Sequence, residues 1–357
     1  MKLDDLTQMQ SAWLQEGGKD SDVVISSRIR LARNLDGYSF VGKATDLDLD
    51  NLKSSVLSVM AKLFRPSETT CLDFADVSND DAVFLMERQL VSQEFVNSKR
   101  PRALLFHNRE EFSVMVNEED HLRLQATAGG FALPETWNRV NALDDKLESE
   151  LTYAFDDTLG YLTASPANVG TGLRASVMLH LPGLVETGEI AKALRGLQKL
   201  NLSVRGLYGE GSRPLGEFFQ VSNQTSLGVS EESIVDELCG VVPSLVEYER
   251  KARATMLARN REGVLDRCFR AMGLLKMART MSMEEAMTHL SSLRLGVRLG
   301  LLEQIPIQLV DDLFLHIQPS HLKRLMNVPV SREKDDEFEE KLRADYIRSN
   351  IPEIEKK

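Results

Sequence analysis

The chain has 357 residues, of which 42% are hydrophobic, and this length predicts one large globular domain with a smaller second one. The net charge is −11 with 27% charged residues, which argues against a general nucleic-acid binder or a protein of anionic membrane surfaces. The sequence has no apolar run of about 18 residues. It also shows no signal-peptide pattern at its start, so we expect a cytoplasmic location.

The first part of the chain predicts an α+β domain. Residues 1–20 are expected to form a helical extension, and residues 21–230 alternate β-rich runs with helical stretches such as 135–153. The expected strands are 103–106, 112–116, 160–164, 175–181, 202–207 and 218–221. Some connections are too short for a crossover helix, so several strands should be antiparallel.

Residues 231–357 read as an all-helical C-terminal domain. The expected amphipathic helices span 231–256 and beyond, 264–278, 282–293 and 309–326, the last interrupted at Pro319. The final residues, 331–357, alternate charges of both signs, which is typical of a solvated helix or a frayed tail.

The three cysteines, Cys71, Cys239 and Cys268, lie far apart and show no C-x-x-C spacing. This pattern predicts buried free thiols rather than disulfides or a zinc site, and no side chain is expected to ligate a metal.

Arginines alternate in the first motif, S-S-R-I-R-L-A-R, which starts at Ser26. On an extended segment the alternation places Arg28 and Arg30 on one face, where an anion between them would relieve their repulsion. A solvated charged strand is the commoner meaning of such a run.

Acidic residues crowd the second motif, N-E-E-D-H-L-R, at residues 117–123. Its carboxylates and His121 could form a metal site, a helix N-terminus or a supported general base, and a capped turn is the simplest alternative.

Two glycine-rich segments follow. In the first, a Gly-Thr-Gly turn precedes Arg174 and would let the backbone approach a ligand. In the second, R-G-L-Y-G-E-G-S, the glycines predict a mobile loop with Arg205 and Glu210 on it. Ordinary surface turns remain an alternative for both.

Together the motifs favour a polyanionic ligand. Arginines recur beside glycine turns in an otherwise acidic chain, which points to a nucleoside triphosphate, while Glu119 and Glu210 call for a cationic partner.

In order and spacing, these motifs resemble the phosphagen kinase family. N-E-E-D-H-L-R and P-x-N-x-G-T-G-L-R carry the resemblance, and S-S-R-I-R-L-A-R-N, R-G-x-Y-G-E-G-S and F-Q-x-S-N-Q make the chain similar to its bacterial protein-arginine kinase branch. The resemblance runs from about residue 21 to the end and weakens after residue 230. It implies a phosphagen-kinase-like catalytic core, an antiparallel sheet flanked by helices, over residues 21–230.

The resemblance implies transfer of a phosphoryl group from ATP, with Mg²⁺, to arginine guanidinium groups of proteins. Glu119, Glu210 and Ser165 take the family's catalytic positions. The residues that would hold the nucleotide are Ser26, Ser27, Arg28, Ile29, Arg30, Arg123, Arg174, Ala175, Ser176, Val177, Met178, Arg205, Gly206, Leu207, Tyr208 and Gly209.

The chain departs from the family at several positions. Ser165 stands where the family has a cysteine, and a hydroxyl cannot supply a thiolate at neutral pH. Gln89 replaces an expected histidine near the nucleotide. Glu339 and Glu340 replace the first Arg-Asp pair of the family's R-D-x-x-R-A motif, which binds phosphoarginine, whereas Arg343 and Ala344 match. Because acids repel phosphate, we expect this feedback to be absent or altered, and activation by added phosphoarginine would argue against that.

The family implies protein substrates with exposed arginines, a role in protein quality control and a partner protein that activates the kinase. The helical domain could also mediate homodimer formation. Two alternatives stay open: a kinase of a free guanidino metabolite, and a non-catalytic regulator that binds phosphoarginine or nucleotide, which Ser165 motivates.

Overall fold

The computed structural model describes residues 2–206, 215–328 and 336–352. Its centre is an eight-stranded sheet in the order β2-β3-β4-β5-β1-β8-β10-β9, in which every neighbouring pair is antiparallel. The strands are β1 (Val24–Arg33), β2 (Thr69–Asp73), β3 (Ala103–His107), β4 (Phe112–Val116), β5 (Leu122–Gly129), β8 (Leu173–His180), β9 (Leu202–Gly206) and β10 (Phe218–Asn223). A separate hairpin pairs β6 (Phe155–Asp156) with β7 (Gly160–Tyr161), so the expected strand 160–164 keeps only its first part. The predicted α+β fold is confirmed.

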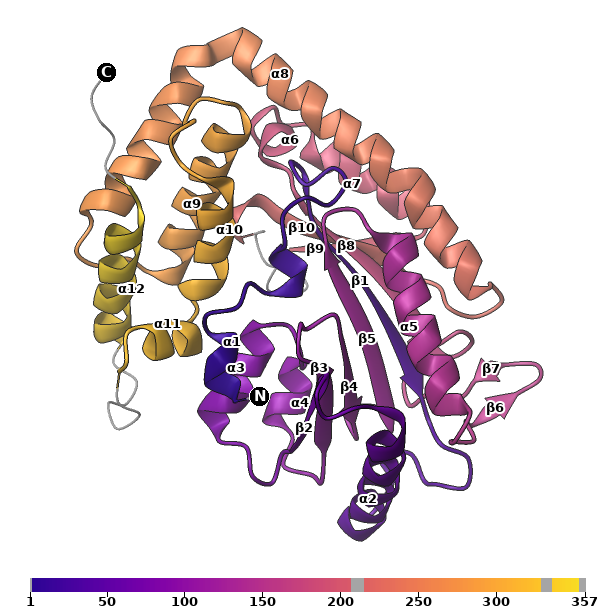
Figure 1. Cartoon of the computed structure of the whole chain (residues 1–357). Helices are drawn as coiled ribbons and strands as arrows, with labels where there is room; N and C mark the ends of the chain where they lie inside the picture. Colours follow the sequence, from indigo (N-terminus) through magenta and orange to yellow (C-terminus); the bar gives the residue numbers. More distant parts are fainter. Residues whose placement is uncertain (1, 207–214, 329–335, 353–357) are drawn as a thin grey trace.

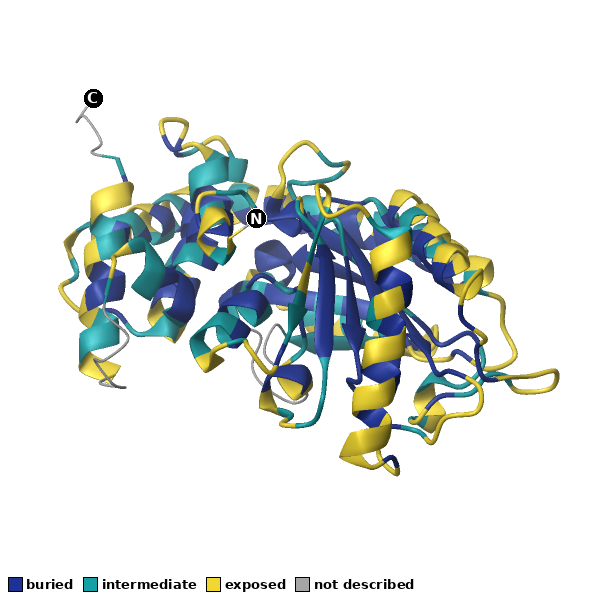
Figure 2. Ribbon diagram, turned by 60° about the horizontal axis from the view of Figure 1, so that its bottom comes forward, coloured by how far each residue is buried: buried dark blue, intermediate teal, exposed yellow. Residues whose placement is uncertain are grey.

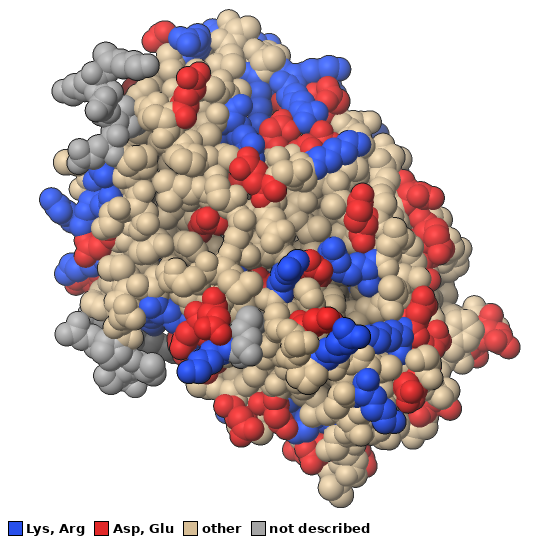
Figure 3. Space-filling model, viewed as in Figure 1, with Lys and Arg blue, Asp and Glu red and all other residues tan. Residues whose placement is uncertain are grey.

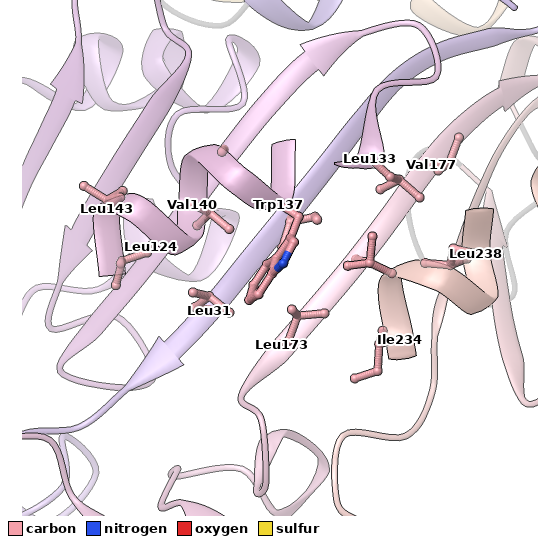
Figure 4. Close-up of a cluster of buried hydrophobic side chains, with 14 of the residues drawn as sticks. Leu31, Leu124, Leu133, Trp137, Val140, Leu143, Leu173, Val177, Ile234 and Leu238 are labelled. Carbon is pink, nitrogen blue, oxygen red and sulfur yellow. The ribbon is translucent and has the colours of Figure 1, made fainter. Parts of the chain in front are cut away.

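The largest hydrophobic cluster lies between one face of this sheet and two helices, α5 (Leu133–Glu148) and the first half of α8 (Glu231–Met277). Trp137 of α5 packs among strand residues such as Leu31 and Leu173, and Ile234 and Leu238 extend the cluster from α8 (Figure 4). Helix α2 (Asp46–Leu63) adds Leu52 and Val56. Burial of alternate strand residues thus fixes which face of the sheet is the core.

Short helices cover the other face of the outer strands. Helices α1 (Leu3–Leu6), α3 (Asn79–Glu87) and α4 (Gln93–Asn97) share a cluster with strand residues such as Phe106. Helices α6 (Pro182–Glu186) and α7 (Ile190–Lys199) lie between β8 and β9 in the chain. Figure 2 shows the buried strands between helices with exposed outer surfaces.

A second hydrophobic cluster joins the second half of α8 to α9 (Met283–Arg298), α10 (Ile307–His316) and α12 (Asp336–Asn350), and it includes side chains of the catalytic region such as Trp13 and Phe218. Helix α11 (Pro319–Leu325) follows α10 in the chain. The backbone of α8 is non-helical at Asn260 (φ −154°, ψ 69°), and Figure 1 shows the helix running over the sheet before it bends toward α9 and α12. One helix therefore spans the two expected segments 231–256 and 264–278, and it packs in both clusters. Helix α12 buries Leu342 and Ile347, so this part of the tail is a packed helix rather than a solvated one.

Two other expectations need correction. In the described part of this segment, residues 2–20, the helical elements are the four-residue α1 and a 3₁₀ turn at Ala12–Leu14, whose Trp13 and Leu14 pack in the second cluster. Cys71 is exposed on strand β2 at the sheet edge and Cys239 is half-buried, so only Cys268 is a fully buried thiol. No helix in the described ranges is long and apolar enough to cross a membrane.

Candidate active site

The face of the sheet opposite the α5 core carries arginines. Strand β1 alternates, with Ile29 and Leu31 in the core and Arg28 and Arg30 on the other side. Arg30 lies directly opposite Arg174 of β8, so guanidinium-bearing residues of two adjacent strands share one face.

The same register brings in further strands. Arg123 of β5 pairs with Ala32, and Arg205 of β9 pairs with Gln220 of β10, which in turn pairs with Met178 of β8. Residues paired across an antiparallel ladder point to the same side, so Arg123 and Arg205 lie on the face of Arg28 and Arg30. We call this surface the arginine face.

The guanidinium groups of the arginine face lie close enough together to lower one another's pKa values. Burial, with the charges of Arg123 and Arg174, lowers the pKa of Arg28 to about 10. Burial also lowers the pKa of Arg30 well below its usual value, and the neighbouring arginines lower it further. The Nε of Arg30 is buried without a hydrogen-bond partner among the residues that the structure describes. An anion placed here would restore both charge balance and hydrogen bonding.

Polar side chains from other elements hold these arginines in place. Arg28 donates to Gln89 Oε1 (3.4 Å) and Gln220 Oε1 (3.2 Å), and Arg174 donates to Ser222 Oγ (3.1 Å). The F-Q-x-S-N-Q motif contains Gln220 and Ser222, but the sequence assigned them no role. The alternation of β10 is the signal that could have placed them on this face.

The N-E-E-D-H motif forms the tight connection between β4 and β5. Asn117, at φ 60°, donates from Nδ2 to the carbonyls of Leu49 and Pro101 (2.9 and 2.8 Å), and its backbone N–H donates to His121 O (2.9 Å). His121 Nδ1 accepts from Leu35 N (3.0 Å). The motif is therefore a hairpin turn held by hydrogen bonds and not a helix N-terminus.

The carboxylates that flank the tip of this hairpin have local partners. Glu118 is buried and forms an ion pair with Arg123. Burial alone would raise the pKa of the Glu118 carboxyl group, but Arg123 and the Ser92 hydroxyl hold this pKa below its ordinary value. Asp120 accepts from Asn34 Nδ2 and from Ala164 N, both at 2.6 Å.

Glu119 differs from both neighbours. It is exposed at the tip of the turn. Partial burial, followed by the charge of Asp120, raises the pKa of its carboxyl group, while Arg123 opposes the shift. A solvent-accessible carboxylate with a raised pKa, near the edge of a cationic surface, is suited to accept a proton.

Ser165 is brought to this hairpin by the contact between Asp120 and Ala164. It is half-buried at the start of a 3₁₀ turn, and its carbonyl accepts from Thr163 Oγ1 (2.8 Å). The structure therefore places Glu119 and Ser165 in adjoining segments, although 46 positions separate them in the sequence.

Comparison with known proteins agrees with this geometry. The family model "ATP:guanido phosphotransferase, C-terminal catalytic domain" matches residues 51–252, and "Protein-arginine kinase McsB C-terminal domain" matches residues 261–357. The chain is 42% identical over 344 residues to a protein-arginine kinase of Desulforamulus reducens, covering 96% of this chain and 95% of the relative. It is 39% identical to the one from Brevibacillus brevis, covering 95% of each. The chain belongs to the protein-arginine kinase family.

Solved structures support the fold of this family member. A crystal structure of lombricine kinase matches with a TM-score of 0.59 at 24% identity, over 71% of each chain. The duplicated taurocyamine kinase of Schistosoma mansoni matches with the same TM-score and identity, over 70% of this chain and 36% of that one.

Not every predicted nucleotide-binding residue faces the arginines. Ser26, Ser176 and Met178 share the arginine face by register, and Ser176 Oγ donates to Arg28 O (3.3 Å). Four others point to the core side, where only their backbone borders the site: Ser27, Ile29, Ala175 and Val177.

Ser27 shows why the alternation matters. Its hydroxyl donates to Gly130 O (2.9 Å) and accepts from Ala132 N (3.0 Å), so it anchors the start of α5 instead of facing a ligand. Gly206 ends β9, and Leu207, Tyr208, Gly209 and Glu210 lie outside the described residues.

The Gly-Thr-Gly turn serves the fold. A Cβ on Gly170 (φ 110°) would lie 2.3 Å from Ser226 O, and one on Gly172 (φ 63°) would lie 2.5 Å from Ala32 O. These glycines allow a close approach to the protein's own backbone, so the expectation of an approach to a ligand is corrected at this turn.

Proposed function

We propose that the chain transfers the γ-phosphoryl group of ATP to arginine guanidinium groups of proteins. The observation that carries this proposal is the arginine face with Glu119 at the hairpin beside it. Family membership over nearly the whole chain supports the reaction class.

The arginine face fits a triphosphate. Arg28, Arg30, Arg123 and Arg174 crowd one surface, and the buried Nε of Arg30 has no hydrogen-bond partner within the described part of the chain. Bound ATP supplies the phosphoryl group, and these guanidinium groups would neutralise the charge of the phosphate oxygens and hold them in line with the acceptor.

We infer that Mg²⁺ accompanies the nucleotide and is held chiefly by phosphate oxygens and water. Within residues 2–206, 215–328 and 336–352, no group of three His, Cys, Asp or Glu side chains could hold a metal ion. Magnesium commonly binds in this way, with few protein ligands.

Glu119 would act on the acceptor. A protonated guanidinium is a poor nucleophile because its pKa is about 12.5 or higher. As the N–P bond forms and the bond between the γ-phosphorus and the bridging oxygen breaks, the attacking nitrogen loses a proton, which the Glu119 carboxylate would accept. Glu210 would orient the other guanidinium nitrogens, and Ser165 could hydrogen-bond to them but supplies no negative charge.

The finer expectations are part of the proposal. We infer a cytoplasmic location, a role in protein quality control, an activating partner protein and self-association through the C-terminal helices. We also expect phosphoarginine feedback to be absent or altered, which is supported by the contacts of two residues. Glu339 pairs with Lys323 (2.7 Å), and Arg343 is buried and donates to the carbonyls of Ile317 (3.2 Å) and Met281 (2.9 Å).

The test is phosphate transfer from ATP and Mg²⁺ to an unfolded arginine-rich protein, read as acid-labile phosphoarginine by mass spectrometry. Glu119→Gln should reduce labelling by about 10²-fold or more with little change in melting temperature, because the side chain is exposed. Glu303→Gln, also exposed, is the matched control.

Three results would contradict this assignment. Equal labelling by wild type and Glu119→Gln would remove Glu119 from the mechanism. Labelling of free arginine alone would favour a metabolite kinase, and ATP binding without any transfer would favour a regulator.

A further inference from the structure

A short hairpin projects from the end of the sheet at which the Glu119 turn lies. It pairs β6 with β7, and Figure 1 shows it extending away from the body of the molecule. Residues 155–159 are all exposed, and they include two large apolar side chains, Phe155 (56% exposed) and Leu159 (45%). Two such side chains on one projecting turn add little to the core and are typical of an interaction surface.

Hydrogen bonds of a buried asparagine fasten the base of the β6–β7 hairpin to the turn that carries Glu119. Asn34 Nδ2 donates to Asp120 Oδ1 (2.6 Å) and to Leu162 O (3.0 Å). The backbone carbonyl of Asn34 accepts from Ala154 N (2.8 Å). Because Ala154 and Leu162 flank the two strands of the hairpin, Asn34 fixes the position of the hairpin relative to the Glu119 turn.

Contacts within the hairpin give it a fixed shape. Phe155 packs edge-on against Tyr161 across the strand pair, with ring centroids 5.2 Å apart. Tyr161 in turn lies over the buried Arg33 guanidinium, 3.5 Å from Cζ to the ring centroid. At the turn, Asp156 Oδ1 accepts from two backbone N–H groups (2.8 and 2.9 Å). A surface that is already ordered loses little conformational entropy on binding, which favours a docking role.

The charge of this part of the chain suits a cationic partner. Between Lys146 and Arg174 the sequence has no basic residue. The acidic residues of this stretch are all exposed, and they are Glu148, Glu150, Asp156 and Asp157. The arginine face suits the phosphates of ATP, whereas these carboxylates favour a partner that carries arginines. Each of the two substrates would therefore meet a surface of opposite charge.

We propose that the β6–β7 hairpin docks the substrate protein, with Phe155 and Leu159 contacting an apolar side chain of an unfolded segment whose arginine reacts at Glu119. This inference rests on the proposed function. Asp120 accepts from Ala164 N, and the chain from Ala164 back to Leu159 spans at most about 17 Å at ~3.3 Å per residue. An extended substrate covers this distance with about five residues. Its apolar side chain should therefore lie about five positions from the acceptor arginine.

An unfolded segment fits this surface better than two other occupants. A free guanidino metabolite is too short to reach the hairpin from Glu119. A second copy of the chain would need a larger contact, because a specific interface between folded proteins buries roughly 1,200–2,000 Å² in total, more than one short turn offers.

The test uses the full chain, ATP with Mg²⁺, and peptides that carry one arginine and one leucine in a glycine–serine background. The leucine lies about two, five or eight positions from the arginine, on either side, and one peptide has no leucine. For wild type, kcat/KM should be about tenfold higher at a separation of five than without leucine, through a lower KM. The double variant Phe155→Gln/Leu159→Gln should label every peptide as wild type labels the leucine-free one.

The matched control is Phe269→Gln/Leu274→Gln, because both side chains are 43% exposed on α8. It should keep the wild-type preference for the leucine. A melting temperature for each variant separates misfolding from a local effect, and Leu159→Gln alone is a milder variant that should show the same direction of change.

Three results would overturn the docking role of the hairpin. Wild type might label all peptides equally, or the hairpin variant might keep the preference for a leucine five positions away. A loss of labelling in the hairpin variant that is equal for all peptides, the leucine-free one included, would show that the hairpin acts on the reaction and not on docking. If wild type labels neither these peptides nor an arginine-rich unfolded protein, the proposed kinase function fails as well, and this outcome is distinct from failure of the hairpin alone.

Discussion

The two faces of the central sheet are built from the same strands but have opposite properties. On the α5 side, Ile29 and Leu31 are completely buried in an apolar cluster. On the other side, Arg28 and Arg30 face like charges and have lowered pKa values. The alternation of β1 therefore separates residues that stabilise the fold from residues that oppose one another until an anion arrives.

The two faces of the sheet contribute differently to the free energy of folding. Apolar burial stabilises by roughly 25 cal/mol per Å² and does not depend on ligand. Crowded guanidinium groups destabilise the unliganded protein and are stabilised when phosphate binds, so ligand binding should raise the stability of the arginine face in particular. On the face shown in Figure 3, acidic and basic side chains are interspersed over much of the surface.

The largest expected effect comes from removing a charge from the arginine face. Arg30→Met should reduce phosphoarginine formation by about 10²-fold or more, because a preorganised donor to the phosphates is lost. Without ligand, the free energy of unfolding should rise slightly, by on the order of 1 kcal/mol, because a half-buried cation beside other cations is replaced by an apolar chain.

Activity and urea denaturation with and without ATP measure both parts of this prediction, and Arg65→Met, at an exposed arginine, is the control. A variant that is less stable than wild type without ligand would contradict the view that the arginines oppose one another.

The second effect belongs to the apolar face. Leu124→Ala should lower the free energy of unfolding by about 2–5 kcal/mol, since Leu124 is fully buried between β1, β4 and α5. Its neighbour Gln125 points to the opposite face and donates to Gln89 O, so Gln125→Ala should cost only about 1 kcal/mol.

Urea denaturation of both variants tests whether substitutions at two adjacent residues of β5, one on each face of the sheet, lower the free energy of unfolding by different amounts. Equal destabilisation would show that the two faces are not separated as the register indicates.

The third effect concerns the contact between the catalytic and C-terminal regions. Burial raises the pKa of Glu87 to about 8, although backbone N–H groups of Ser320 and His321 oppose the shift. A carboxyl group with a raised pKa binds more protons in the folded state, so its contribution is complete below about pH 4.5. The contribution is lost as the pH rises through about 8. Wild-type stability should therefore fall over this interval.

Glu87→Gln should remove this fall in stability between about pH 4.5 and 8, because an amide does not titrate in the interval and retains a carbonyl acceptor. Thermal melts of wild type and variant from pH 5 to 9 provide the comparison. Parallel pH profiles would show that Glu87 does not titrate in this range.

Local patterns predicted the elements of the arginine face well. The alternation of β1, the acidic hairpin motif and the positions of Arg123 and Arg174 were readable from the sequence, because strand periodicity and charge are local properties. Two other features could not be read locally, because they depend on pairing between distant segments. One is the strand register that places Arg30 opposite Arg174. The other is the contact of Asp120 with Ala164, which places Ser165 beside the hairpin.

Other features were misread for physical reasons. The Gly-Thr-Gly turn serves packing against Ser226, which composition cannot distinguish from ligand contact. Ser27 and Val177 entered the predicted site from the motif; their side chains point to the core, so only their backbone can border a ligand. Gln220 was passed over, because a neutral amide gives no signal until its strand is paired.

The smallest expected effect is at Ser165, which lies beside the hairpin of Glu119. A hydroxyl stays neutral at all relevant pH values, whereas a thiol titrates near pH 8.5 and lower still beside a cationic substrate. Ser165→Cys should therefore raise the rate of protein labelling by only a fewfold, about 0.5–1 kcal/mol in barrier height, with the gain growing from pH 7 to 9. Ser165→Ala should change it by less than about threefold, since the hydroxyl supplies no charge to the guanidinium. A large loss in Ser165→Ala would mean that the serine does more than fill the place of the family's cysteine.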